Sequence, residues 1–117
     1  MAGRKLTRDG AGKMFCLAGV GGRVPGIMKT TESAEDILAI DGCSIDCVKH
    51  TLLQAGFTKF KHVKLAEMGM EKGKSPVTDE AVAKAAAAGK AALDGNAPAA
   101  QPSACEPKSG NCGCSCK

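Results

Sequence analysis

The feature that most constrains this chain is a short apolar run that stops abruptly and leads into a helical pattern. Residues 36–40 read Asp-Ile-Leu-Ala-Ile and end at the turn signal Asp41-Gly42. A continuous apolar run of this length is typical of a strand covered on both faces. Residues 43–55 then carry apolar side chains at helical spacing and stop before Gly56, a natural helix C-cap. This pattern predicts a strand that turns directly into a helix.

Other segments repeat the alternation. We predict further strands over residues 13–18 and 61–66, and further helices over residues 27–34 and 78–94. Strands and helices in alternation indicate a parallel sheet with crossover helices. The expected fold is therefore α/β: a small open parallel sheet of about three strands with crossover helices, followed by a disordered Cys-rich C-terminal tail.

Length and composition bound the domain and its partners. The 117 residues allow one domain, which we assign to residues 1–94, with a flexible linker and Cys-rich tail over residues 95–117. The net charge of +4 comes from Lys and Arg spread along the chain, without the basic patch and aromatic residues typical of nucleic-acid binding. No segment approaches the roughly 20 apolar residues of a membrane helix, and none reads as a secretory signal. We therefore expect a cytoplasmic protein without nucleic-acid or membrane partners.

Seven cysteines carry the strongest chemical signal. In a reducing compartment, clustered thiols argue for metal or redox chemistry more than for structural disulfides. Cys43 and Cys47 stand at the predicted strand-to-helix junction, where ligands of parallel sheets bind and a helix N-terminus stabilises thiolate. Their spacing of four would place both on one helical face. Cys16, at the end of the predicted strand 13–18, would emerge at the same edge, and three thiolates suit Zn²⁺.

The two histidines are weaker candidates. His50 completes Cys-x-x-His with Cys47 and could add a ligand, but we expect it to be exposed. His62 begins a Lys-flanked strand, and we expect it to be solvated as well.

Several further residues admit two interpretations. Asp41 could orient a metal ligand through a hydrogen bond, or simply cap the following helix. Gly42 is explained by turn geometry.

The Gly-rich stretch 19–26 lacks the fingerprints of nucleotide-binding loops, although its amides could complete a pocket beside Cys16. The tail could capture soft metal ions or carry its thiols by accident; its cysteines are Cys105, Cys112, Cys114 and Cys116.

On these residues the chain resembles the DGC-domain family of small bacterial and archaeal proteins expected to bind zinc. The likeness covers about residues 5–94 and is carried by Cys-Leu-Ala-Gly from Cys16 and Asp-Gly-Cys-x-x-x-Cys from Asp41. It implies a metal-binding α/β domain with Cys16, Cys43 and Cys47 as ligands, and it supplies no characterised reaction. Members usually begin with another strand that carries a cysteine. Here the first residues look like the end of the helix after it, which leaves the fourth ligand unassigned and exposes a sheet edge to a second copy.

The leading hypothesis is therefore an accessory protein that buffers or senses zinc or another thiophilic metal ion. The alternative is a thiol-disulfide redox or thiol-transfer protein that uses Cys43 and Cys47. A third reading is an interaction module that uses the Ala-rich helix. No catalytic constellation assembles from the remaining residues, so an enzyme is not favoured, although three zinc ligands and an open position would also suit hydrolysis.

Overall fold

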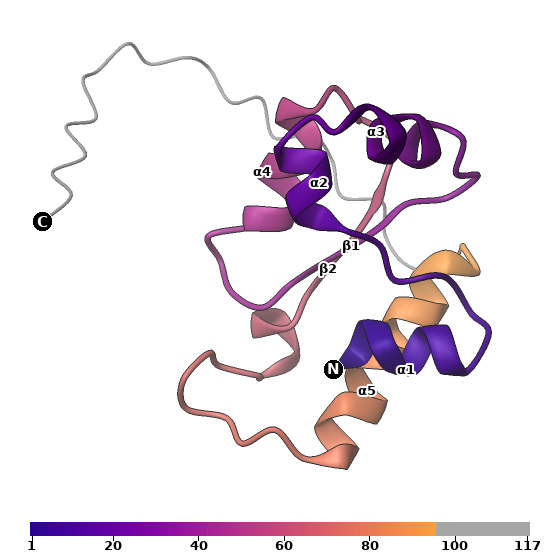
Figure 1. Cartoon of the computed structure of the whole chain (residues 1–117). Coiled ribbons are helices and arrows are strands. Elements are labelled where there is room, and N and C mark those ends of the chain that lie inside the picture. The colour runs from indigo at the N-terminus through magenta and orange to yellow at the C-terminus, as the bar shows by residue number, and fades with distance from the viewer. Residues whose placement is uncertain (96–117) are drawn as a thin grey trace, which may run out of the picture.

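The computed structural model of this protein describes residues 1–95 and has a two-stranded parallel sheet between two groups of helices (Figure 1). Strand β1 (Leu38–Asp41) pairs with β2 (Lys61–Lys64), with Leu38 opposite Lys61 and Asp41 opposite Lys64. The predicted α/β class is confirmed, with two strands in the described residues instead of about three. The helices are α1 (Ala2–Arg8), α2 (Leu17–Gly21), α3 (Pro25–Glu32), α4 (Cys47–Gln54), the 3-10 turn η1 (Ala66–Met68) and α5 (Asp79–Leu93).

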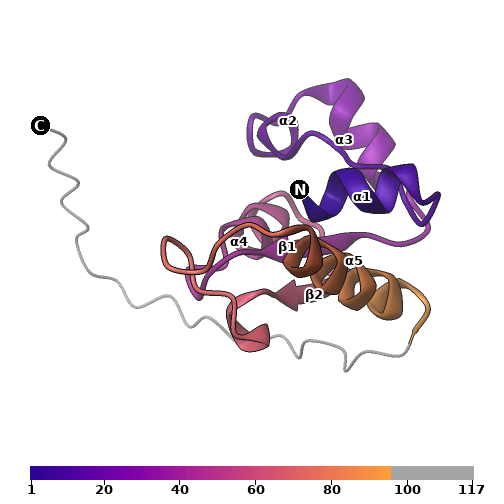
Figure 2. The same ribbon diagram turned by 90° about the horizontal axis from the view of Figure 1, so that it is seen from below.

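The helices lie on both sides of the sheet. Helices α4, α2 and α3 lie on one side, and α5 with α1 lies on the other (Figures 1 and 2). Among the helices of residues 1–95, none is long and apolar enough to cross a membrane.

Side chains of β1 alternate between the two helical groups, as the period of a strand requires. Ala39 is fully buried in a cluster with Val20 of α2 and Leu52 of α4. Leu38 and Ile40 point the other way, toward Gly89 of α5. The continuous apolar run is thus explained by a strand with helices on both faces.

Helix α5 has the start and end that the sequence predicts. The Thr78 hydroxyl accepts a hydrogen bond from the Ala81 amide at 3.2 Å, and Asp79 and Glu80 complement the helix dipole in the first turn. Its buried face consists of small residues, which let the helix approach the sheet closely: Ala85, Ala86, Gly89 and Ala92.

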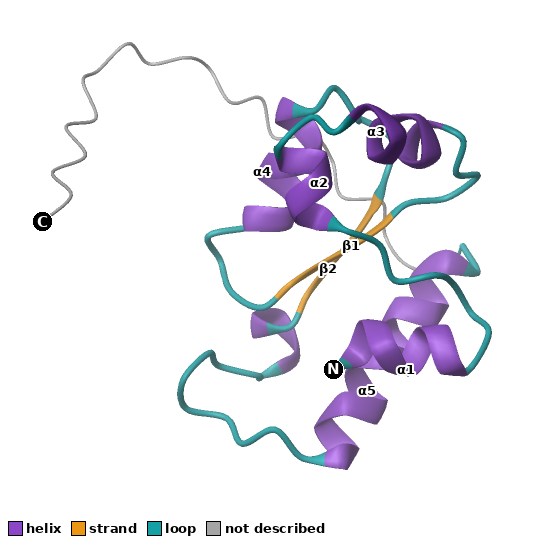
Figure 3. Ribbon diagram, viewed as in Figure 1, coloured by secondary structure: helices purple, strands orange, loops and turns teal. Residues whose placement is uncertain are grey.

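The predicted strand over residues 13–18 is wrong. Residues 12–16 are irregular, and Leu17 opens α2, whose last residue is Gly21 (Figure 3). In the described residues this segment has no neighbouring strand to pair with. A short apolar run does not by itself distinguish strand from helix. The Gly-rich stretch 19–26 is likewise mostly helical, since α2 and α3 are separated by only three residues.

The helix predicted over residues 43–55 begins four residues late, at Cys47. Val48 and Leu52 belong to the core cluster as expected, whereas Ile45 is 66% exposed in the preceding loop. The predicted strands 36–40 and 61–66 and the predicted helix 27–34 are confirmed with small shifts of their bounds.

Strand β1 has a second edge that no strand of residues 1–95 covers. Beside β1 lies an open apolar cavity of about 730 Å³, bounded by α1, α2 and β1. Met14 and Phe15 line it and are 55% and 41% exposed.

Gly19 offers a test of the packing between α2 and α3. A Cβ at this position would lie 2.8 Å from Ile27 Cγ1, closer than real Cβ contacts. We expect Gly19→Ala to lower the free energy of unfolding by about 1–3 kcal/mol, since overpacking forces neighbours to shift. Gly21→Ala is the matched control on the same helix, because its nearest contact would be an ordinary 3.6 Å from Thr51 Cγ2. Urea unfolding of the three proteins would measure this, and equal stabilities of both variants would contradict it.

Candidate functional site

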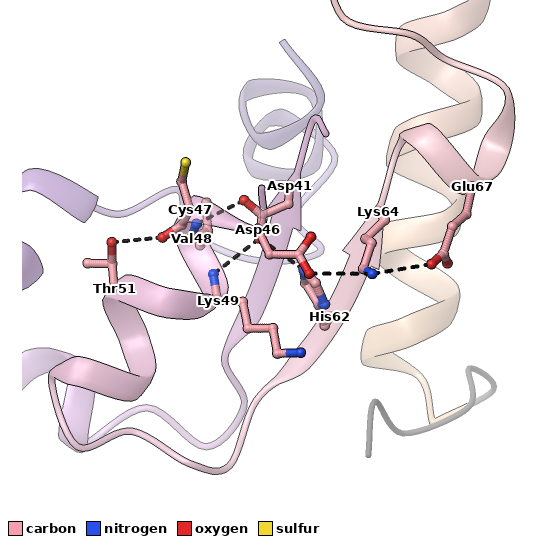
Figure 4. Close-up of polar contacts among 9 residues, drawn as sticks. All are labelled: Asp41, Asp46, Cys47, Val48, Lys49, Thr51, His62, Lys64 and Glu67. Carbon is pink, nitrogen blue, oxygen red and sulfur yellow. Dashed lines mark hydrogen bonds and ion pairs between the residues drawn. The ribbon is translucent and has the colours of Figure 1, made fainter. Parts of the chain in front are cut away.

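The Asp41 carboxylate, at the carboxyl end of β1, organises the strand-to-helix junction (Figure 4). Its Oδ1 accepts a hydrogen bond from the Val48 amide at 2.8 Å, and its Oδ2 accepts one from the Lys49 amide at 3.1 Å. These are the second and third amides of α4, the donors that a helix cap normally satisfies. Asp46, the N-cap by position, makes no such bond. Of the two roles considered for Asp41, these hydrogen bonds show helix capping, and Asp41 caps α4 from across the loop.

His62 completes this arrangement from β2. Its Nε2 lies 2.9 Å from Asp41 Oδ2, and the two side chains are only 2% and 5% exposed. The imidazole N–H donates to the carboxylate. The expectation that His62 is solvated is therefore wrong. In the parallel register His62 lies opposite Ala39, whose side chain is in the core. The alternation of side chains along β2 therefore explains the burial of His62, whereas the lysines on either side of it do not.

Asp46 lies at the other end of the loop, and the residue is only 8% exposed. Its backbone is left-handed, with φ 54° and ψ 43°, a conformation that Asp and Asn tolerate best among non-glycine residues. Its Oδ2 lies 3.4 Å from Lys64 Nζ, which also approaches Glu67 Oε1 at 3.5 Å. Hydrogen bonding to Asp46, together with its negative charge, raises the pKa of Lys64 above its ordinary value, and Glu67 adds to this.

Asp41, Asp46 and His62 bring three side chains of metal-ligand type close together. One carboxylate oxygen from each aspartate and one ring nitrogen of His62 lie within 4.8 Å of one another. No other three His, Cys, Asp or Glu side chains of residues 1–95 meet this criterion. Sequence reasoning missed Asp46 and His62 as a site, because the helix was expected to include Asp46 and the strand register was unknown.

The cysteines are placed differently from the prediction. Cys47 is the first residue of α4 and is exposed, and its side chain points away from the Asp46 carboxylate (Figure 4). Cys43 is half-buried in the turn before α4, where its carbonyl accepts from the Asp46 amide at 3.2 Å. The two thiols therefore do not share a helical face, since Cys43 lies outside the helix.

Cys16 precedes α2 and does not end a strand. It is exposed, and its Sγ accepts a hydrogen bond from the Gly19 amide at 3.4 Å as the N-cap of that helix. Helices α2 and α4 pack side by side, with both amino-terminal ends pointing the same way (Figure 1). Cys16, as the N-cap of α2, and Cys47, as the first residue of α4, thus lie at the starts of neighbouring helices. The sulfurs of Cys16, Cys43 and Cys47 are nevertheless not all within 4.8 Å of one another.

The remaining candidates are quickly placed. His50 is exposed on α4, as expected. Gly42 has no positive φ, and a Cβ there would meet nothing within 4 Å, so turn geometry does not require glycine at this position. The four tail cysteines lie outside the described residues.

Comparison with known proteins gives two findings. The sequence model of the DGC domain matches residues 1–88. A Pseudomonas aeruginosa protein named anaerobic and virulence modulator AnvM is 40% identical over 68 residues, which is 58% of this chain and 52% of that protein. The chain thus spans about half the length of this relative. No solved structure matches the chain.

Asp41 is the residue whose loss should be most damaging at this junction. Asp41→Ala removes the cap of α4 and leaves the buried His62 N–H without its acceptor. We expect the free energy of unfolding to fall by about 2–4 kcal/mol, as the sum of a lost cap and an unsatisfied buried donor. Asp36→Ala is the control, because that carboxylate is 53% exposed and, within residues 1–95, pairs only with Lys61 at 3.1 Å. It should change stability by at most about 1 kcal/mol. Similar losses in both variants, measured by thermal unfolding, would refute the assignment.

Proposed function

This chain belongs to the DGC domain family, and on that premise we propose that it is an accessory protein that binds zinc or another thiophilic metal ion. The ligands in this proposal are Cys16, Cys43 and Cys47. The observation that carries it is the position of these thiols: Cys16 and Cys47 lie at the starts of two neighbouring helices, and Cys43 lies on the loop that leads into the second.

Binding in this proposal requires the loop between β1 and α4 to move. Thiolates that share one tetrahedral zinc ion at about 2.3 Å lie nearly 4 Å apart, closer than the three sulfurs stand here. Residues 42–45 are the segment that can adjust, because Asp41 holds the start of α4 by its side chain. Cys47 is already exposed, so its thiol needs no unfolding of α4 to reach an ion.

We base the proposed cellular location on the free thiols and the proposed role on the name of the Pseudomonas aeruginosa relative. Free cysteines persist in the reducing cytoplasm, which is where we place the protein. The relative is named a modulator, and we extend to this chain a sensing role in preference to simple metal storage. A second copy that covers the free edge of β1 remains part of the proposal, since exposed strand edges invite pairing.

Elemental analysis of protein purified without added metal tests the proposal. We expect about one zinc per full-length chain, and less than a tenth of that in the Cys43→Ser/Cys47→Ser double variant, because a site with one remaining thiolate binds zinc far more weakly. The matched control replaces the four tail cysteines, Cys105, Cys112, Cys114 and Cys116, by Ser and should keep its zinc.

Two results would contradict this assignment. Zinc that survives in the double variant and disappears from the tail variant would move the site to the tail. A metal-free protein whose Cys43 and Cys47 form a reversible disulfide would favour the thiol-disulfide alternative.

A further inference from the structure

We propose that Asp41, Asp46 and His62 form a second cation site, distinct from the thiols, for a divalent ion that prefers oxygen and imidazole ligands, such as Mn²⁺. Two carboxylates and one imidazole are the donors that suit such ions, whereas thiolates select softer ones. The three side chains converge from the end of β1, the start of α4 and the middle of β2 (Figure 4).

The strongest evidence is an oxygen without a partner. Asp46 Oδ1 is buried and accepts no hydrogen bond from any group of residues 1–95, and the residue as a whole is only 8% exposed. A buried polar atom left unsatisfied is costly, and more so on a charged group. Lys64 approaches the other oxygen, Oδ2, and therefore does not relieve this cost at Oδ1. A cation bound at Oδ1 would relieve it.

The spacing of the other two ligands fits an ion as well. His62 Nε2 and Asp41 Oδ2 are 2.9 Å apart. Two ligands held at right angles at about 2.1 Å from one ion would be about 3 Å apart, so the pair needs almost no movement. The ion would take the place of the Nε2 proton, and the neutral imidazole would carry its proton on Nδ1.

Charge also favours a cation here. Asp41 and Asp46 bring two negative charges, and the Lys64 ammonium group offsets one of them. The Asp41 carboxylate keeps its two amide donors from α4, so its position is fixed before an ion arrives. The Cys47 side chain points away from this group (Figure 4), which separates the second site from the proposed thiol site.

Titration of the full-length chain with Mn²⁺, followed by the electron paramagnetic resonance signal of the free ion, tests the proposal. Wild-type protein should bind about one Mn²⁺, and Asp46→Asn should weaken binding at least about tenfold, since even indirect partners of a metal contribute that much. Asn keeps the size of the side chain and tolerates the left-handed backbone. Glu67→Gln is the matched control, because it removes the other carboxylate beside Lys64 without touching the cluster and should bind as wild type does.

Thermal unfolding provides an independent measurement. Mn²⁺ should raise the Tm of the wild type and of Glu67→Gln, and it should not raise that of Asp46→Asn, because only a native site links binding to stability. Cys43→Ser/Cys47→Ser should retain Mn²⁺ binding, so failure of the thiol site and failure of this site are distinguishable. No Mn²⁺ binding by the wild type, equal binding by Asp46→Asn, or loss of Mn²⁺ with the two cysteines would each overturn the proposal.

Discussion

The structure of this domain depends on one buried carboxylate. Asp41 ends the first strand, and its two oxygens accept hydrogen bonds from the Val48 and Lys49 amides of α4 and from the His62 ring of β2. Hydrogen bonds to an ionised acceptor are stronger than those between neutral groups, and burial strengthens them further. One side chain therefore fixes the end of β1, the start of α4 and the position of β2 relative to both.

The two aspartates that flank the loop contrast with each other. Asp41 has partners for both oxygens, whereas one buried oxygen of Asp46 has no partner in the part of the chain that the structure describes. A fold normally satisfies its buried polar groups, and local violations of this rule concentrate where proteins bind something. The same loop carries Cys43, so the half-buried thiol lies between two carboxylates that hold the ends of the loop.

Much of the fold could be predicted from the sequence, and less of the site. The apolar run before Asp41 and the capped start of α5 are local signals, and both led to correct elements. Gly19 pointed to a loop because glycine is a poor helix former, yet it lies within α2, where close packing against Ile27 requires glycine. The start of α4 and the burial of His62 depend on hydrogen bonds between distant residues, which no local pattern encodes. For the same reason the cysteines could be chosen as candidates, but not positioned.

The alanine-rich face of α5 has a consequence for how this domain holds together. Alanine and glycine lose no rotamer freedom when they are buried, so docking α5 costs mainly backbone entropy. The larger side chains at this contact come from the opposite surfaces, from Leu6 and Leu38. Each of these small side chains buries little apolar area. The helix must therefore lie very close to the sheet for the contact to gain enough dispersion energy. The contact of α5 with β1 and α1 therefore has little spare room: a methyl group added at Gly89 would lie 3.1 Å from Leu38 Cδ2 and from Leu6 Cδ1, and these side chains would have to shift.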